Sequence, residues 1–412
     1  MDGIRTRLGL PREAGLIVLM FLAFRLMMLI TLRPEHLTFF GDYQYYFDLA
    51  RLSDRGLWPY LHYWMEYPPI FPFLSTVVYR LTASGGYNVY VLAIGAIGTL
   101  FGAGNLIVLM RLAARMHGEA TAARLGWVYS LLFVPLVIGW WQFEAITAFC
   151  ILFALDRLLD RRDVSSAIAT GLGVMVKLVP VLILPAVALA RPIRKTILYA
   201  VLVALIVVLI AAPLLAAAPD TARASFMSPL GWSSWETVWA LIDGNLRTGA
   251  LGGIDIHLDK AQATTPVGNP SRVPDWLKAI VFGVGYMVLV WRLRSASGDA
   301  NYKTIGILAI TYVAFLLWSK GWSPQWQVIL FPLILLMMPD RLGIGFVLVF
   351  GLVNLAEWPV LISRGLWQAV PATILLRTLL LIVLLIELVR RCQRMGYQRT
   401  GKRISGWATD VS

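Results

Sequence analysis

The feature that most constrains this chain is a series of apolar runs, each close to the length that crosses a lipid bilayer. A spanning helix needs about 20 consecutive apolar residues. The candidate spans are residues 14–32, 87–112, 125–138, 145–159, 197–215, 276–293, 302–318, 326–338, 342–358 and 366–388. The chain is also 58% hydrophobic and 14% charged, which excludes an ordinary water-soluble fold. We therefore expect an all-α polytopic fold in which residues 1–412 form a single integral membrane domain with about ten transmembrane helices.

The positions of lysine and arginine predict the orientation of these spans. The net charge of +13 comes from short basic clusters between apolar runs rather than from one patch, so we do not expect nucleic-acid binding. The clusters assigned to the cytoplasmic side lie near residues 5–12, 111–124, 157–162, 191–195, 292–303 and 390–403. This pattern predicts a multi-pass protein of the cell membrane with cytoplasmic N- and C-termini. Two long loops, residues 33–86 and 216–275, are then expected on the extracytoplasmic side.

Residues 163–195 are expected to form a re-entrant helix pair rather than a full span. Basic residues lie at both ends of the segment, which places both ends on the cytoplasmic side. Lys177 lies in the middle and is followed by Pro180 and Pro185. A charge at membrane depth is costly and proline interrupts a helix, so the segment should bend back. Lys177 either pairs with Glu144 or lines a pathway.

The first outer loop holds an acidic residue between two predicted interfacial helices. Residues 43–55 have helical spacing and end at Gly56, and a second helix is expected after Pro69, running through Tyr79. Asp42 comes just before the first of these helices. A carboxylate held against the bilayer is partly desolvated, which raises its pKa and suits a general base. The alternative is that Asp42 only caps the helix that follows it.

The second outer loop offers weaker signals. Glu236 and Asp243 are spaced to share one helix face, with Asp243 at the helix end. His257 lies between Asp255 and Asp259, which is either a weak metal-binding pattern or part of a solvated loop. The tryptophans of this loop are Trp232, Trp235 and Trp239. These rings either stack on a sugar or anchor the loop at the membrane interface.

Taken in order, these segments resemble the GT-C superfamily of membrane glycosyltransferases, and most closely the polyprenol-phosphate-mannose-dependent mannosyltransferases. The matching segments are Asp42, Gly56 to Tyr60, Tyr67 to Pro69, Lys177 to Pro180, Trp235 to Asn245 and Ser319 to Gln327. The resemblance implies a GT-C fold and transfer of a sugar, mannose, from a polyprenyl-phosphate carrier. The acceptor would be a hydroxyl of a glycolipid, a glycan or a protein on the extracytoplasmic side, for biosynthesis of a glycolipid or cell-envelope glycan.

The resemblance also assigns site residues. The catalytic aspartate of the superfamily maps onto Asp42, which would act as the base and give inversion at the anomeric carbon. A phosphate leaves readily, so one carboxylate suffices where a glycosidase usually needs two. Some relatives carry a second acid two positions after this aspartate, but here that residue is Gln44. No metal ion or other cofactor is therefore expected, because a divalent ion prefers several oxygen ligands.

Further residues are candidates for binding the donor and the acceptor. A cation near the membrane edge is suited to hold the lipid phosphate. The candidates for the donor phosphate are Lys320, Lys177, Arg25, Arg247 and His257. The candidates for other substrate contacts are Tyr45, Tyr67, Glu66, Glu236, Trp322 and Gln325.

Two other classes of function stay open at this stage. A lipid or small-molecule transporter would use the intramembrane cations Arg25 and Lys177 to mark its pathway. The lack of a visible internal repeat disfavours this interpretation. A non-catalytic scaffold subunit of a membrane assembly is the third possibility.

Overall fold

A computed structural model describes residues 9–33, 36, 40–139, 142–247, 253–295 and 298–405, without the side chains of residues 29, 30, 295 and 395–405. The described part of the chain consists of helices and loops, with two isolated β-bridges and no extended strand. The expected all-α polytopic fold is confirmed.

The helices follow one another along the whole chain. In order they are α2 (Ala14–Thr31), α4 (Tyr43–Arg51), η1 (Leu52–Arg55), α5 (Ile70–Thr82), η2 (Ala83–Gly85), α6 (Gly86–His117), α7 (Glu119–Leu131), η3 (Val134–Ile138), α9 (Glu144–Leu159), α10 (Asp163–Val176), η4 (Val179–Ile183), α11 (Leu184–Ala190), α12 (Ile193–Ala217), α13 (Pro219–Gly231), α14 (Val238–Asp243), η5 (Ile254–Leu258), η6 (Lys260–Thr264), α15 (Asp275–Ser295), α16 (Ala300–Trp318), η7 (Pro324–Trp326), α17 (Gln327–Met337), α18 (Arg341–Leu355), η8 (Ala356–Ile362), η9 (Trp367–Ala369) and α19 (Val370–Ser405).

Each of the ten expected spans contains a helix. Within the described residues, six helical stretches are long and apolar enough to cross a membrane, and the other expected spans are shorter. The expected span 125–138 is one of these: α7 ends at Leu131, and a separate π-helical turn, η3, continues to Ile138. Pro135 lies in η3 and cannot donate a backbone hydrogen bond, which accounts for the change of helix type.

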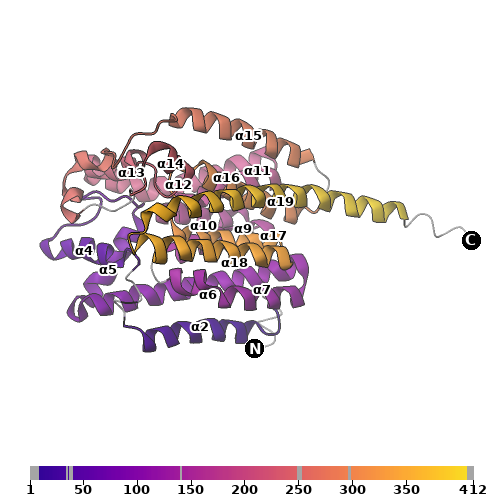
Figure 1. The fold of residues 1–412 in the computed structure, drawn as a ribbon, viewed down its shortest axis with the longest axis horizontal. Helices are drawn as coiled ribbons and strands as arrows, with labels where there is room; N and C mark the ends of the chain where they lie inside the picture. The colour runs from indigo at the N-terminus through magenta and orange to yellow at the C-terminus, as the bar shows by residue number, and fades with distance from the viewer. Residues whose placement is uncertain are drawn as a thin grey trace, which may run out of the picture.

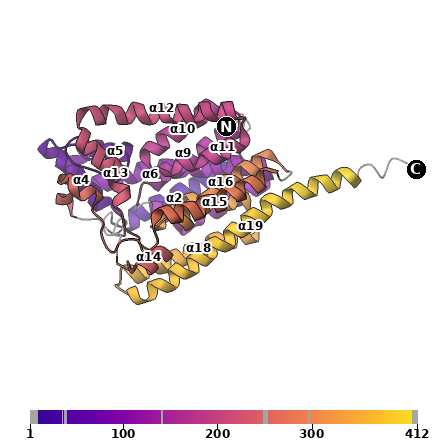
Figure 2. The same cartoon turned by 90° about the horizontal axis from the view of Figure 1, so that it is seen from above.

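The long helices lie side by side, and the short helices of the two loops gather at one end of the bundle (Figure 1). These short helices are α4, α5, α13 and α14. The start of α2 and the far end of α19 both lie toward the opposite end, and the view from above agrees (Figure 2). A common end for both is what a membrane protein with both termini on one side requires.

Burial distinguishes the inner helices from those that face outward. In α16, 67% of the residues in its apolar 18-residue stretch are buried, and every residue of α17 is buried. In the corresponding stretches of α12 and α15 only 11% of the residues are buried, although both helices are strongly apolar. Exposed apolar side chains on such long helices are stable only against lipid. We conclude that α12 and α15 lie on the outside of the bundle, facing the bilayer.

The segment predicted to re-enter the membrane is broken at Lys177. Helix α10 ends at Val176, Lys177 has an extended backbone, and η4 and α11 follow. The Lys177 ammonium forms an ion pair with Glu144, which is 1% exposed. The pairing with Glu144, one of the two alternatives for Lys177, is therefore present. The depth of this helix pair in a membrane stays a prediction.

The Lys177–Glu144 pair generates a prediction for stability. Replacing Glu144 alone with leucine leaves the Lys177 ammonium, whose side chain is 14% exposed, without its counter-ion, which costs on the order of 3–5 kcal/mol. The double variant Glu144→Leu/Lys177→Met removes both charges and should recover most of this loss. The measurement is thermal unfolding of the purified protein in detergent. A single variant as stable as the wild type would show that the pair does not matter for stability.

Candidate active site

The two long loops are joined by hydrogen bonds around Trp64. The backbone N–H of Trp64 donates to the carbonyl oxygen of His257 (3.0 Å), and the indole N–H donates to the carbonyl of Ile256 (2.9 Å). The indole and imidazole rings are 4.3 Å apart. Next to Trp64, the Met65 N–H donates to the Ser225 hydroxyl in α13 (3.0 Å). The first loop thus lies directly on the second.

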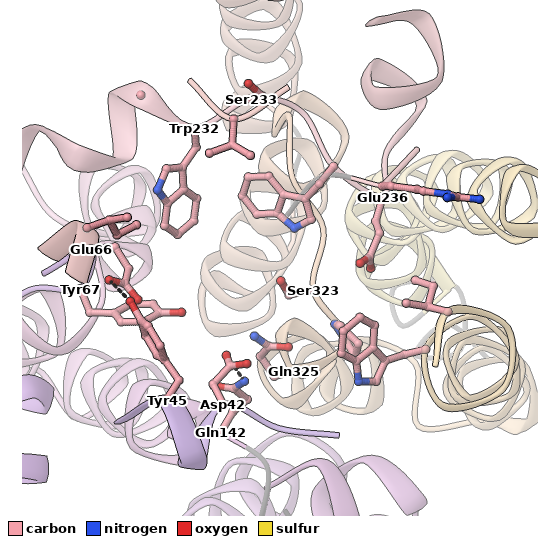
Figure 3. A pocket seen from close by; sticks show the side chains of 18 of the residues that line it. Asp42, Tyr45, Glu66, Tyr67, Gln142, Trp232, Ser233, Glu236, Ser323 and Gln325 are labelled. Atoms are coloured by element: carbon pink, nitrogen blue, oxygen red, sulfur yellow. Dashed lines mark hydrogen bonds between the residues drawn. The ribbon is translucent and has the colours of Figure 1, made fainter. Parts of the chain in front are cut away.

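Beneath this contact lies a cavity of about 320 Å³, which is within the range of small-molecule sites (Figure 3). It is lined by Phe40, Asp42, Tyr45, Trp64, Glu66, Tyr67, Ile138, Gln142, Gly231, Trp232, Ser233, Trp235, Glu236, Arg247, Ile256, His257, Gln262, Ala263, Thr265, Val267, Ser323, Pro324, Gln325, Trp358, Ile362 and Trp367. The lining combines three carboxyl groups with several aromatic rings. Such a mixture suits a polar ligand that also presents apolar faces.

Asp42 is at the N-cap position of α4 but does not cap the helix. Its side chain makes no capping hydrogen bond, so the alternative role of Asp42 as a cap is wrong. Instead, the Gln142 amide N–H donates to Asp42 Oδ2. The Tyr46 hydroxyl donates to Gln142 Oε1 (2.8 Å), which fixes the orientation of that amide. In Figure 3 the Asp42 carboxyl group lies beside Gln142 and Gln325 at one wall of the cavity.

The surroundings of Asp42 make its carboxyl group a stronger base than an exposed aspartate. Burial raises the pKa of Asp42 to about 6, while the Gln142 hydrogen bond and the positive charge of Lys177 oppose this rise. The negative charge of Glu144, and that of Glu66 when it is ionised, act in the same direction as burial. Asp42 is thus an ionised base near neutral pH, poised to take up a proton.

A second group of polar side chains lies at the next wall of the cavity. The Tyr45 hydroxyl lies 3.0 Å from Glu66 Oε2 and 2.5 Å from His257 Nε2. The other ring nitrogen, His257 Nδ1, donates to the carbonyl oxygen of Trp64 (2.7 Å). Burial raises the pKa of Glu66 to about 7 and lowers the pKa of His257 to about 4. His257 is 1% exposed, so the expectation that it lies in a solvated loop is wrong.

The metal-binding pattern around His257 is not assembled. Within the ranges that the structure describes, no group of three or more His, Cys, Asp or Glu side chains is placed to hold a metal ion. Asp259 instead caps η6 by accepting a hydrogen bond from the Ala261 N–H (3.0 Å). Both nitrogens of His257 have hydrogen-bond partners within the protein.

Glu236 lies on the far side of the cavity from Glu66 (Figure 3). It precedes the N-cap of α14, so the prediction that Glu236 and Asp243 share a helix face is wrong. The predicted helix end is confirmed, because α14 ends at Asp243 and Gly244 has a left-handed backbone. Glu236 has φ of 51°, which is strained for a residue with a side chain and is typical of functional positions.

The strained backbone of Glu236 is held by a buried arginine. The Arg377 guanidinium donates to the Glu236 carbonyl oxygen and to the Glu357 carboxylate. Its carbon atom Cζ lies 4.4 Å from the centre of the Trp322 ring. Burial and the neighbouring Glu357 raise the pKa of Glu236 to about 8, and Arg377 opposes them. Glu236 Oε2 is buried without a hydrogen-bond partner, which leaves it available to a ligand in the cavity.

Of the cations predicted to bind a phosphate, the structure brings only Arg247 and His257 to the cavity wall. Lys320 pairs with Asp275 (3.3 Å) and does not line the cavity. Lys177 lies under the wall, 5.6 Å from the Tyr67 ring centre. Arg25 is buried in α2 and donates to the carbonyl oxygen of Pro135.

Of the residues predicted to contact the substrate, some line the cavity and others do not. Those at the wall are Tyr45, Glu66, Tyr67, Glu236 and Gln325. Trp322 is 1% exposed and packs against Arg377 instead. Among the tryptophans of the second loop, Trp232 and Trp235 line the cavity, whereas Trp239 donates its indole N–H to the Leu317 carbonyl (3.1 Å).

Several wall residues were not predicted from the sequence. Gln142, Ser233, Trp358 and Trp367 lie far from Asp42 in the chain and carry no motif. The Arg377–Glu357 pair had a signal, because each charge interrupts an apolar run and such charges usually find a partner. Predicting the Arg377–Glu357 ion pair from the sequence would have identified the arginine that donates to the Glu236 carbonyl oxygen.

Comparisons with known proteins identify a family model and distant structural neighbours. The model of glycosyltransferase family 87 matches residues 64–319, more than half of the chain. No curated protein matches the chain. The apo crystal structure of the Archaeoglobus fulgidus oligosaccharyltransferase has a TM-score of 0.45 and 13% identity, covering 93% of this chain and 56% of that one. The same organism's AglB in complex with an inhibitory peptide and a dolichol-phosphate has a TM-score of 0.37 and 14% identity, covering 93% and 55%. This chain therefore spans little more than half the length of those proteins.

The contact between Gly321 and Trp235 generates a prediction for the second loop. The backbone N–H of Trp235 donates to the backbone carbonyl oxygen of Lys320 (3.0 Å). A methyl group on Gly321 would overlap the Trp235 ring. Gly321→Ala should therefore displace this wall of the cavity, at a cost of roughly 1–3 kcal/mol. The measurement is hydrogen–deuterium exchange at residues 232–237, which should become faster.

The matched control for this variant is Gly345→Ala, because an added methyl group at Gly345 meets open space. The double variant Gly321→Ala/Trp235→Leu should restore slow exchange in the neighbouring amides by relieving the overlap. Unchanged exchange in Gly321→Ala would contradict the assigned contact.

Proposed function

The chain belongs to glycosyltransferase family 87, and on this premise we propose that it transfers mannose from a polyprenyl-phosphate carrier to an acceptor hydroxyl. It is a multi-pass membrane protein and a glycosyltransferase of the GT-C type. The observation that carries the finer proposal is Asp42, whose carboxylate is held at the wall of a cavity by Gln142 and spends no hydrogen bond on capping.

In this mechanism Asp42 takes the proton from the acceptor hydroxyl as the oxygen attacks the anomeric carbon. The bond between that carbon and the phosphate oxygen breaks at the same time, and the polyprenyl phosphate leaves with the electron pair. Attack from the face opposite the phosphate inverts the anomeric configuration. A raised pKa favours this role, because proton uptake is most efficient when the pKa of the base lies near the working pH.

We assign the donor phosphate to Arg247. It is the only lysine or arginine among the wall residues, and its guanidinium carbon lies 5.8 Å from the centre of the Trp367 ring. Both nitrogens of His257 are already engaged, which leaves it without a donor for a phosphate oxygen. Lys320 is held by Asp275 outside the wall, so its contribution is to the surrounding field.

The sugar is proposed to lie between Asp42 and the second loop. Trp232 and Trp235 line the cavity, and sugars stack their apolar C–H faces on such rings. Glu236 Oε2 and the Ser233 hydroxyl are buried without hydrogen-bond partners in the protein. Sugar hydroxyls would satisfy both groups. The acceptor hydroxyl belongs to a glycolipid, a glycan or a protein on the extracytoplasmic side, and the distribution of lysine and arginine along the sequence supports this side for both loops.

The transporter alternative loses its main argument in the structure. Lys177 was one of the two cations that would mark a pathway, and it is paired with Glu144. Arg25, the other, is fully surrounded by protein and is 2% exposed. A charge so enclosed serves packing rather than passage.

One prediction of this mechanism concerns the catalytic base. Asp42→Asn keeps the size of the side chain but removes its ability to accept a proton, so sugar transfer should fall by about 10²–10⁴-fold. The KM for the donor should change little. The measurement is transfer of radiolabelled sugar from a panel of polyprenyl-phosphate sugars by the purified protein.

The control for this prediction is Asp48→Asn, which alters a carboxylate on the same helix that interacts with Gln44 and Arg51. It should leave transfer unchanged. Near-normal turnover by a folded Asp42→Asn variant would rule out the assigned base.

Another prediction of this mechanism concerns the pH dependence of sugar transfer. The base must be ionised, and burial raises the pKa of Asp42 to about 6, so kcat/KM should fall about tenfold per pH unit below that value. An exposed aspartate would retain activity down to about pH 4. Gln142→Met removes the hydrogen bond that favours the ionised form, so it should move the midpoint to higher pH. A midpoint that is the same in both proteins would contradict the role of Gln142.

A further inference from the structure

Glu66, Tyr45 and His257 form one continuous chain of hydrogen bonds along the cavity wall. Glu66 Oε2 lies 3.0 Å from the Tyr45 hydroxyl, which lies 2.5 Å from His257 Nε2. The chain ends where His257 Nδ1 meets the Trp64 carbonyl oxygen at 2.7 Å. Glu66 is 5% exposed and His257 is 1% exposed, so bulk water does not share these bonds.

Counting the protons of this chain fixes its charge. A carbonyl oxygen only accepts, so His257 Nδ1 carries a proton and donates it to Trp64. A neutral His257 then accepts at Nε2, and only the Tyr45 hydroxyl is there to donate. The single Tyr45 proton is committed, so the bond to Glu66 is made only if Glu66 is protonated and donates to Tyr45. The alternative, an ionised Glu66 with a doubly protonated His257, has the same number of protons. In both cases the chain is neutral.

The surroundings decide which group holds the proton. Among the described residues, the charge of Glu66 raises the pKa of Asp42, Tyr45, Tyr60, Tyr63 and Tyr67, all of which are acids. Within the described residues, no lysine or arginine forms an ion pair with Glu66. Burial favours the neutral form of both groups: it raises the pKa of Glu66 to about 7, against hydrogen bonds from its own backbone and from Tyr45, and lowers that of His257 to about 4, against the hydrogen bond to Trp64. The proton therefore resides on Glu66.

We propose that Glu66 is a neutral carboxylic acid in the resting protein, hydrogen-bonded to Tyr45 and through it to His257, and that its neutrality allows the cavity to bind an anionic donor. This inference deepens the proposed function and rests on it for the identity of the donor. An ionised Glu66 would add a second negative charge beside Asp42 in a cavity of about 320 Å³. A phosphate entering that cavity would be repelled by both carboxylates.

The second carboxyl oxygen of Glu66, Oε1, indicates what a neutral Glu66 would bind. Oε1 is buried and makes no hydrogen bond within the protein. In a neutral carboxylic acid this oxygen is a carbonyl acceptor, suited to a hydroxyl group of the donor sugar. Glu66 thus acts as a donor-binding residue, while Asp42 remains the base.

The proton itself is tested by infrared spectroscopy, which does not depend on activity. A protonated carboxyl group has a C=O stretching band above the amide I region. Between about pH 6 and pH 7, the difference spectrum of wild type and Glu66→Gln should contain this band. The band should disappear with a midpoint near pH 7, and Tyr45→Phe should shift it. A difference spectrum without a protonated-carboxyl band would overturn the proposal, even if no sugar transfer has been detected. If Glu66→Gln does not fold, the shift in Tyr45→Phe provides the same assignment.

The consequence for donor binding is tested by the pH profile of transfer. Above about pH 7, ionisation of Glu66 should lower kcat/KM for the donor about tenfold per pH unit, with a smaller effect on kcat. Glutamine mimics the neutral acid and donates to Tyr45 in the same way. Glu66→Gln should therefore lose the alkaline decline, so that its kcat/KM stays level from about pH 6.5 to about pH 9. An inactive but folded Glu66→Gln, or an unchanged alkaline decline, would overturn this role. Absence of transfer in wild type with any polyprenyl-phosphate sugar would instead refute the proposed function.

Discussion

The structure of the site depends on the contact between the two outer loops at Trp64. Two donors of this residue, its backbone N–H and its indole N–H, bond to the segment that carries His257. This contact forms the part of the cavity wall that holds Trp64, Ile256 and His257 beside Glu66, which is 5% exposed, whereas Asp42 is half-buried. Desolvation is the largest cause of the raised pKa of both carboxyl groups.

Two ion pairs support the residues of the cavity wall. Lys177 pairs with Glu144, and Arg377 pairs with Glu357, so each of these two cations has a carboxylate partner. The arginine also holds the strained backbone of Glu236. Removing one partner from such a pair is costly because it leaves a buried charge uncompensated. These pairs therefore position the wall residues without touching a ligand themselves.

The sequence predicts some of these features and not others, for physical reasons. Apolar run length depends on local composition, so a helix in each of the ten apolar runs was predicted, as were the helix ends at Gly56 and Gly244, whereas α13 in the second loop was not. The position of Asp42 after the first span was also visible. The contacts of His257 were not, because they join residues 193 positions apart and depend on how the loops dock. For the same reason Lys320, a cation at the end of a span, was expected at the site although Asp275 holds it outside. The role of Gln142 likewise depends on a contact 100 positions away.

The most direct measurement of the central claim is a cryo-EM structure with a non-transferable polyprenyl-phosphonate mannose bound. The account predicts the sugar ring in the cavity between Asp42 and Trp232, with the phosphonate group at Arg247 and the anomeric carbon facing the Asp42 side. A sugar bound at the opposite end of the bundle, or separated from Asp42 by protein, would contradict it.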